Sequence, residues 1–413
     1  MKVFNHKHFV RHISMPTLQE FTQAHILAQH LQIDWTCPVD QIPQLVNAAV
    51  EIVEVRLAGT ELSKSERETL EHALYLWQDD LRRTHLMSND YATQEFLTAC
   101  SDDDQVLQAF ASRDEREKAL WMMVNRDKAF RDAELHIAFK AKTNGKYWKK
   151  HRIQSGLTAS SERAHLDAFS AEVATLFKKS GGGSSTHVEY SYRNADDSVQ
   201  LTIYVEGPVT AIAHFSEQHF QRITTRIALE TALVYHPATG NIETVVKGGG
   251  KNHTAVLALF GKHVVHTNLQ PEEIEKTRYK LNELRDGLME PFEDLSTCGV
   301  EKVRLRRAQF TPKGASGISV GFEASPSKEE PDAIHLALEL LKFRHSLEAE
   351  FNMDGATVVV YTQAKGDKRV GQFSFDVYSS GSSTISNLPV QNKQIAQTVL
   401  QALGVLDAEV TSA

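Results

Sequence analysis

The stretch ELHIAFKAK at residues 134–142, followed by TNGK at 143–146, decides the predicted fold. Its larger apolar residues alternate with His136, Lys140 and Lys142, and this period of two is typical of a half-buried strand. Asn144-Gly145 then supplies the two residues that most readily adopt the positive φ angles of a tight hairpin turn. The sequence therefore predicts a β-hairpin whose return strand covers residues 147–153.

The residues before this stretch follow a helical period instead. Apolar residues recur every three or four positions across 17–31 and 63–81. Ser63, with Glu66 three positions later, has the pattern of a capping box, which predicts that a helix begins there. Shorter helices are expected at 91–100, 104–112 and 115–124. Because the period changes near residue 130, we predict an all-helical domain over residues 1–128.

The rest of the chain reads as two similar α+β units. The first, residues 129–269, continues after the hairpin with elements expected at 161–179, 188–192, 199–205, 228–247 and 254–265. The second, residues 270–413, repeats the order with elements expected at 272–289, 303–323, 332–351, 357–378, 383–388 and 392–403. The predicted fold class is thus α+β, an all-helical domain followed by two units of the order helix, hairpin, helix, hairpin, helix. Residue identity between the units is low, so an internal duplication and a chance likeness stay as alternatives.

Composition excludes several classes of protein. The chain has 413 residues, of which 41% are hydrophobic and 24% are charged, as is ordinary for a globular protein. A disordered chain, a collagen-like fibre and a disulfide-stabilised miniprotein are excluded. The net charge of −8 also excludes a generally basic protein that coats nucleic acid, although a local basic face is compatible with it. Residues 1–130 hold 20 Asp and Glu against 13 Lys and Arg, so the predicted helical domain carries most of the negative charge.

The cysteines and the apolar segments predict where the protein resides. Cys37, Cys100 and Cys298 are far apart and form no CxxC pair, so a zinc ribbon or redox pair is not expected and a reducing compartment fits best. No segment reaches the roughly 18 apolar residues of a membrane span, and the N-terminus lacks the apolar core of a signal peptide. We therefore expect a cytoplasmic protein without a membrane contact, and no metal site or cofactor.

Basic residues gather in two of the predicted hairpins. Residues 139–152 contain six Lys or Arg and no acid, with Tyr147 and Trp148 between them, and residues 300–313 contain five Lys or Arg against Glu301 alone. A two-stranded ribbon can enter a nucleic-acid groove, where cations contact phosphates and aromatic rings stack on bases. The predicted nucleic-acid-binding residues are Lys140, Lys142, Lys146, Trp148, Lys149, Lys150, Arg152, Lys302, Arg304, Arg306 and Arg307. Lys302, Arg304 and Arg306 alternate with apolar residues and should share one exposed face. Edge strands also carry Lys and Arg to prevent aggregation, which is the simpler alternative.

A Gly-rich loop at residues 247–254 is the second candidate site. It is expected between a strand and a helix, where backbone N–H groups can hold a phosphate. The residues predicted to bind phosphate are Lys247, Gly249, Gly250, Lys251 and His253. The loop lacks the spacing of a P-loop, and the chain has no Rossmann fingerprint.

These patterns lead to one main functional prediction and two alternatives. The main prediction is a non-enzymatic protein that binds the phosphate backbone of DNA or RNA through the two basic hairpins. One alternative is a protein–protein interaction scaffold whose acidic helical domain binds a partner protein. The other is a phosphate- or nucleotide-handling enzyme that uses the loop 247–254. No arrangement of a nucleophile and a base is evident, so no catalytic residue is predicted and enzyme activity is not favoured.

Overall fold

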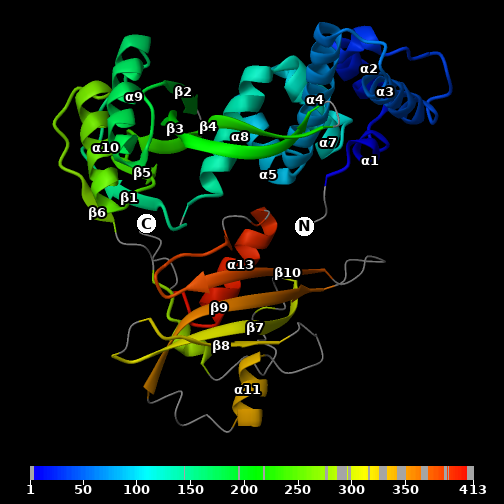
Figure 1. The fold of residues 1–413 in the computed structure, drawn as a ribbon. Helices are drawn as coiled ribbons and strands as arrows, with labels where there is room; N and C mark the ends of the chain where they lie inside the picture. Colours follow the sequence, from blue (N-terminus) through cyan, green and yellow to red (C-terminus); the bar gives the residue numbers. More distant parts are fainter. Residues whose placement is uncertain are drawn as a thin grey trace. The chain divides into compact units, whose positions relative to one another are not determined.

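The computed structural model has an α+β fold in which an N-terminal helical region precedes two antiparallel sheets, one of them curled into a half-barrel (Figure 1). It describes residues 4–143, 145–193, 196–216, 219–274, 278–285, 295, 299–314, 317–324, 333–341, 350–363, 371–385, 388 and 390–406. The chain divides into two compact units. The first contains Met1–Ala138, Ser155–Gly240 and Thr254–Leu269, and the second contains Phe139–Gln154, Asn241–His253 and Gln270–Ala413. The division into domains 1–128, 129–269 and 270–413 stays a prediction.

The helical region is part of the first unit. It comprises α1 (His6–Val10), α2 (Met15–Ala24), η1 (Ile26–His30), α3 (Ile42–Ala58), α4 (Lys64–Leu86), α5 (Asp90–Ala99), α6 (Asp104–Ala111), α7 (Glu115–Asn125) and α8 (Asp127–Lys140). Trp77, Phe96 and Phe130 are fully buried in its core. The capping box is confirmed, since Glu66 donates its backbone N–H to Ser63 Oγ and accepts from the Ser63 N–H. Helix α3 was not predicted.

The predicted strand at residues 134–142 is wrong, because this stretch lies largely in helix α8. The residues of α8 that are buried are Phe130, Ala133, His136 and Phe139. They recur every three positions, which is a helical spacing and not the period of two of a strand, and each neighbouring pair lies on the same side of the helix. Leu135 and Ile137 are only partly buried. The alternation arose because a polar side chain, His136, lies on the buried face, where an apolar residue is the usual choice.

The strands of the first unit form the longest ladder of the molecule. Strands β2 (Thr186–Arg193), β3 (Ser198–Ser216) and β4 (His219–His236) pair antiparallel in this order. Helix α9 (Arg163–Phe177), the 3-10 turn η2 (Lys178–Ser180) and, from Thr254 onward, helix α10 (Gly250–His263) complete the unit. Phe260 of α10 contacts Phe169 of α9 and Tyr235 of β4, with ring centroids 6.4 and 5.7 Å apart. The helices expected at 161–179 and 254–265 and the strands at 188–192 and 199–205 are confirmed.

The second unit contains two groups of strands. Strand β1 (Trp148–Arg152) pairs antiparallel with β5 (Asn241–Val245) on one side and with β6 (Glu272–Ile274) on the other. The order of the complete six-stranded sheet is β2-β3-β4-β5-β1-β6. The four-stranded sheet has the order β10-β9-β7-β8, from β7 (Val300–Pro312), β8 (Val320–Glu323), β9 (Phe351–Thr362) and β10 (Gln372–Tyr378). Its core also includes Ala396 and Leu400 of α13 (Val390–Ala402), so this helix covers one face of the sheet.

Two hairpins of the second unit are confirmed, and two other elements are wrong. The hairpins predicted at 303–323 and 357–378 correspond to β7–β8 and β9–β10, and α13 confirms the helix at 392–403. The helix predicted at 272–289 begins instead with β6, followed later by the 3-10 turn η3 (Leu281–Leu284). In the segment predicted as a strand, 383–388, Ser383 makes only an isolated bridge to Val377. Helix α11 (Ala333–Leu341) covers one part of the helix expected at 332–351, whereas Phe351 at its predicted end belongs to strand β9.

The internal duplication is not supported by the described residues. In the predicted unit 129–269, the first hairpin is replaced by helix α8 and the strand β1. Its counterpart in the predicted unit 270–413, at residues 303–323, is a true hairpin. The order of elements is therefore not repeated. Among the described residues, no helix combines the length and the apolar character needed to cross a bilayer.

Candidate functional site

The basic segment 139–152 is not a protruding hairpin. Its strand β1 has a neighbour on both sides, and Asn144 of the predicted turn lies outside the described residues. Trp148 is only 7% exposed, and its Nε1 donates to Glu243 Oε2 at 2.9 Å. A ring held in this way is not available to stack on a base, and Trp148 is therefore left out of the contacts proposed below. Tyr147 keeps this ability, because 40% of it is exposed.

The cations of this segment differ in their surroundings. Lys149 Nζ lies 2.6 Å from both carboxylate oxygens of Glu273, and this bond holds the pKa of Glu273 below its usual value. Lys150 is opposite Glu243 in the strand register. Lys146 and Arg152 are exposed, and Lys146 Nζ lies 5.5 Å from the centre of the Tyr147 ring, a cation–π geometry. The predicted uniform row of cations is therefore partly neutralised by acids that lie far away in the sequence.

A pair of lysines marks a basic surface at the end of α8. Lys393, in the first turn of α13, is half-buried, and burial together with the nearby charge of Lys140 lowers its pKa. Like charges repel one another, and an anion bound beside both lysines would be attracted by each of them. Lys393 was not among the predicted residues, because it is about 250 positions from Lys140 and nothing in the local pattern joins them.

The second basic segment, in β7, does not present one row of cations. Arg304 is only 7% exposed, so it does not lie on the exposed face expected for Lys302, Arg304 and Arg306. The register of β7 against β9 shifts between Leu305 and Arg307, which leaves Arg306 as the extra residue of a β-bulge. Arg306 Nη2 lies 3.3 Å from Glu323 Oε1 on β8. Arg307 is exposed and Lys302 is partly buried.

The Gly-rich loop has the predicted position directly before a helix. Gly248 and Gly249 have φ angles of +104° and +81°, and α10 begins at Gly250. His253 is 2% exposed, and its Nδ1 lies 2.7 Å from Thr244 Oγ1 in the interior, so its side chain is not on the surface of the loop.

The cation beside this helix start is Lys149. A Cβ added at Gly250 would lie 3.7 Å from Lys149 Nζ. Because Lys149 is bound to Glu273, a phosphate at this place would compete with that carboxylate. Lys247, Gly249, Gly250 and Lys251 are exposed, and phosphate binding by them stays a prediction.

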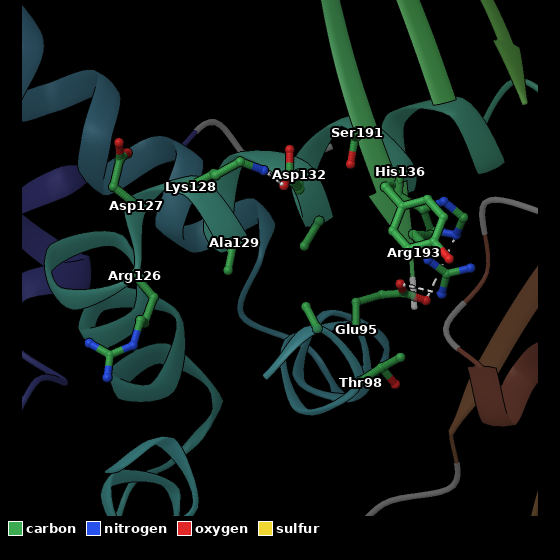
Figure 2. A pocket seen from close by; sticks show the side chains of 13 residues that line it. Glu95, Thr98, Arg126, Asp127, Lys128, Ala129, Asp132, His136, Ser191 and Arg193 are labelled. Carbon is green, nitrogen blue, oxygen red and sulfur yellow. Dashed lines mark hydrogen bonds and ion pairs between the residues drawn. The ribbon is translucent and has the colours of Figure 1, made fainter. Parts of the chain in front are cut away.

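A cleft that the sequence did not predict lies within the first unit (Figure 2). It has a volume of about 510 Å³ and is lined by residues 95, 98 and 99 of α5, residues 126–129, 132, 133 and 136 at and near the start of α8, and residues 191–193 of β2. We call it the α5–α8 cleft. Such a volume is within the range of small-molecule sites in proteins.

A buried charge network forms one wall of the α5–α8 cleft. Glu95 is 8% exposed, and its carboxylate accepts a hydrogen bond from Arg193 Nη2 at 2.7 Å and lies 3.8 Å from His136 Nε2 (Figure 2). Arg193 also donates to Asp196 at 2.7 Å. Burial and the neighbouring Glu95 raise the pKa of Tyr91 to about 12, so its hydroxyl stays protonated at neutral pH.

The network could not be found by sequence reasoning, because its members come from three separate segments. Glu95 is on α5, His136 on α8 and Arg193 on β2, and each alone is an ordinary charged residue in the sequence. The one local signal is His136, whose position in a run of apolar residues is compatible with a buried polar site. That signal was interpreted as the polar face of a strand.

No protein-family model matches the chain, and no curated protein matches it.

Proposed function

We propose that the protein binds the phosphate backbone of a nucleic acid, without catalysing a reaction, through a basic surface of its second unit. The observation that carries the proposal is the segment 139–152, which contains six Lys or Arg and no acid and in which Lys146, Tyr147 and Arg152 are exposed. A polyanion bound to these cations would release its own condensed counterions. Lys140 lies near Lys393 of the same unit, so the surface extends to α13.

The proposed contacts differ from the predicted set. They comprise Lys140, Lys142, Lys146, Lys150, Arg152 and Lys393, with Tyr147 as the exposed ring that could stack on a base. Trp148 and Arg304 are left out because they are buried, and Lys149 and Arg306 because they pair with acids. Lys302 and Arg307 stay as secondary contacts on β7.

The experiment measures binding of a labelled 20-nucleotide DNA, single-stranded and as a duplex, by fluorescence anisotropy at several salt concentrations. With roughly four to five phosphate contacts, the slope of log K against log salt for the duplex should be about −4, at about 0.9 per contact. The triple variant Lys140→Ala, Lys142→Ala, Lys146→Ala should weaken binding and flatten the slope by about 2 to 3.

A matched control separates this surface from net charge. The variant Lys64→Ala, Lys178→Ala, Lys179→Ala removes three exposed lysines of the first unit and should leave the slope unchanged. Equal losses in the two triple variants would refute a specific basic surface. Binding no tighter than millimolar at about 50 mM salt would refute the function itself and favour the scaffold alternative.

A further inference from the structure

The strands β3 and β4 continue together beyond the strand that flanks β3 (Figure 1). Strand β2 pairs with β3 as far as Val205, and the Glu206 N–H then donates to the Ser185 carbonyl at 2.9 Å. After a β-bulge, residues 209–216 of β3 pair with residues 219–226 of β4. We call these two segments the β-arm.

The β-arm exposes large apolar side chains. Phe215 and Phe220 are 69% and 58% exposed, and their rings meet edge-on across the two strands with centroids 5.7 Å apart. Val209, Ala211 and Ala213 are also exposed and alternate along β3 with Phe215, so the four share one face of the ribbon. An exposed apolar patch of this kind is typical of a surface that contacts another protein.

The outer edge of β3 lacks the features that normally prevent strands from pairing. Charged side chains and proline protect natural edge strands. The β4 half of the β-arm carries Arg222 and Arg226, whereas residues 209–216 contain no Asp, Glu, Lys, Arg or Pro. Among the described residues, no strand other than β4 pairs with residues 209–216. This edge therefore presents a row of N–H and C=O groups to a further strand.

The side chains of this edge fit a second copy of the same strand. Two identical strands that pair antiparallel are related by a two-fold axis. With the axis at Ile212, Val209 of one copy lies opposite Phe215 of the other. Ala211 then lies opposite Ala213, on the same exposed face. The pairing removes apolar side chains from water and brings no two charges together, whereas the arginines of β4 disfavour the addition of a further strand at the other edge.

We propose that the protein forms a two-fold dimer in which the β3 edges of two β-arms pair antiparallel around Ile212. The two ribbons become one four-stranded sheet, in which Val209 of each copy packs beside Phe215 of the other. The β-arm belongs to the first unit, and the dimer does not depend on nucleic-acid binding by the second.

The experiment measures the mass and the dimer Kd of the full-length protein by sedimentation velocity between about 0.5 and 100 µM, a range that covers weak and moderate association. The wild type should reach the mass of two chains and dissociate on dilution. The variant Ala211→Lys, Ala213→Lys places two pairs of like charges opposite one another across the axis. Its Kd should rise at least about ten-fold, because like charges directly opposite destabilise a strand pair.

Two further variants test the register and the edge. Ala211→Lys, Ala213→Glu places opposite charges across the same axis and should keep the Kd within about three-fold of the wild type. Thr224→Lys adds an exposed cation to β4, opposite Ala211 in the ladder of the β-arm itself, and should leave the Kd unchanged. Far-UV circular dichroism checks that each variant is folded.

Three results would overturn the proposal. The first is a wild type that stays monomeric at about 100 µM or that assembles beyond two chains. The second is an equal Kd for the two double variants, because the register around Ile212 requires them to differ. The third is a loss of dimer in Thr224→Lys as large as that in Ala211→Lys, Ala213→Lys, which would assign the contact to a face of the β-arm and not to the β3 edge.

Discussion

His25 should make the helical region sensitive to acid. Its side chain is 6% exposed, its Nδ1 accepts the Leu27 N–H at 3.0 Å, and its ring meets the Trp77 ring edge-on at 5.3 Å. Burial lowers the pKa of His25 from 6.5 to about 4. Asp80 Oδ2 lies 3.7 Å from His25 Nε2, but Arg83 already pairs with Asp80 at 3.2 Å, so burial dominates.

The sign and size of the effect follow from proton binding in the two states. Between about pH 4 and 6.5 the unfolded chain binds a proton on His25 that the folded chain does not bind, so the free energy of unfolding falls as the pH falls through this range. The complete difference between the two pKa values corresponds to about 3 kcal/mol, present above pH 6.5 and lost below pH 4. Between pH 8 and pH 5 the loss should be about 2 kcal/mol.

The perturbation that tests this is His25→Asn, which keeps an acceptor for the Leu27 N–H but does not titrate. Urea unfolding of the full chain, followed by tryptophan fluorescence at pH 8 and pH 5, gives the free energy of unfolding. Trp35, Trp77 and Trp121 report on the helical region. The variant should lose about 2 kcal/mol less than the wild type between the two pH values. His72→Asn, at an exposed position on α4, controls for the removal of one histidine. Equal pH dependence in His25→Asn and wild type would refute the reasoning.

Two further predictions concern backbone features. Ser63→Ala removes the capping box of α4 and should lower the free energy of unfolding by about 1 kcal/mol, measured by urea titration. The control Ser65→Ala, at the exposed second residue of α4, should leave this free energy unchanged. Gly248→Ala should destabilise the protein more than Gly249→Ala, because both have positive φ but only the Cβ at Gly248 would meet Asn252 Nδ2, at 2.1 Å. Thermal melting of the two variants checks this, and equal losses would contradict it.

The parts of the fold that sequence predicted are those fixed by local chemistry. Ser63 with Glu66 located the start of α4, and the segments flanking residues 237–240 and 363–371 located strands through their composition. Prediction was wrong at α8 because the position of His136 on the buried face is set by a tertiary partner, Glu95, and not by its neighbours in sequence. Strand β6 was mistaken for a helix because its partner β1 lies about 120 residues earlier.

The candidate sites also depend on contacts between residues that are far apart in the sequence, and local patterns do not contain this information. A count of charges over residues 139–152 was correct, but no pattern in the sequence indicated which cations have partners. Lys149 pairs with Glu273, and Trp148 bonds to Glu243, across separations of 124 and 95 residues. The α5–α8 cleft needs three segments at once, and none of them carries a motif.

The structure thereby divides the basic residues into two groups that should act differently. Where a cation already has a carboxylate, as Lys149 has Glu273, a phosphate gains only the difference between two similar charge-assisted bonds. Where two cations lie near one another, as Lys140 and Lys393 do, a phosphate would meet both positive charges at once. Affinity for a polyanion should therefore be weakened at lysines that a carboxylate already holds, as Glu273 holds Lys149, and should not follow simply from the number of lysines in a segment. This is why the surface at the end of α8, and not the complete run from 139 to 152, is the stronger candidate.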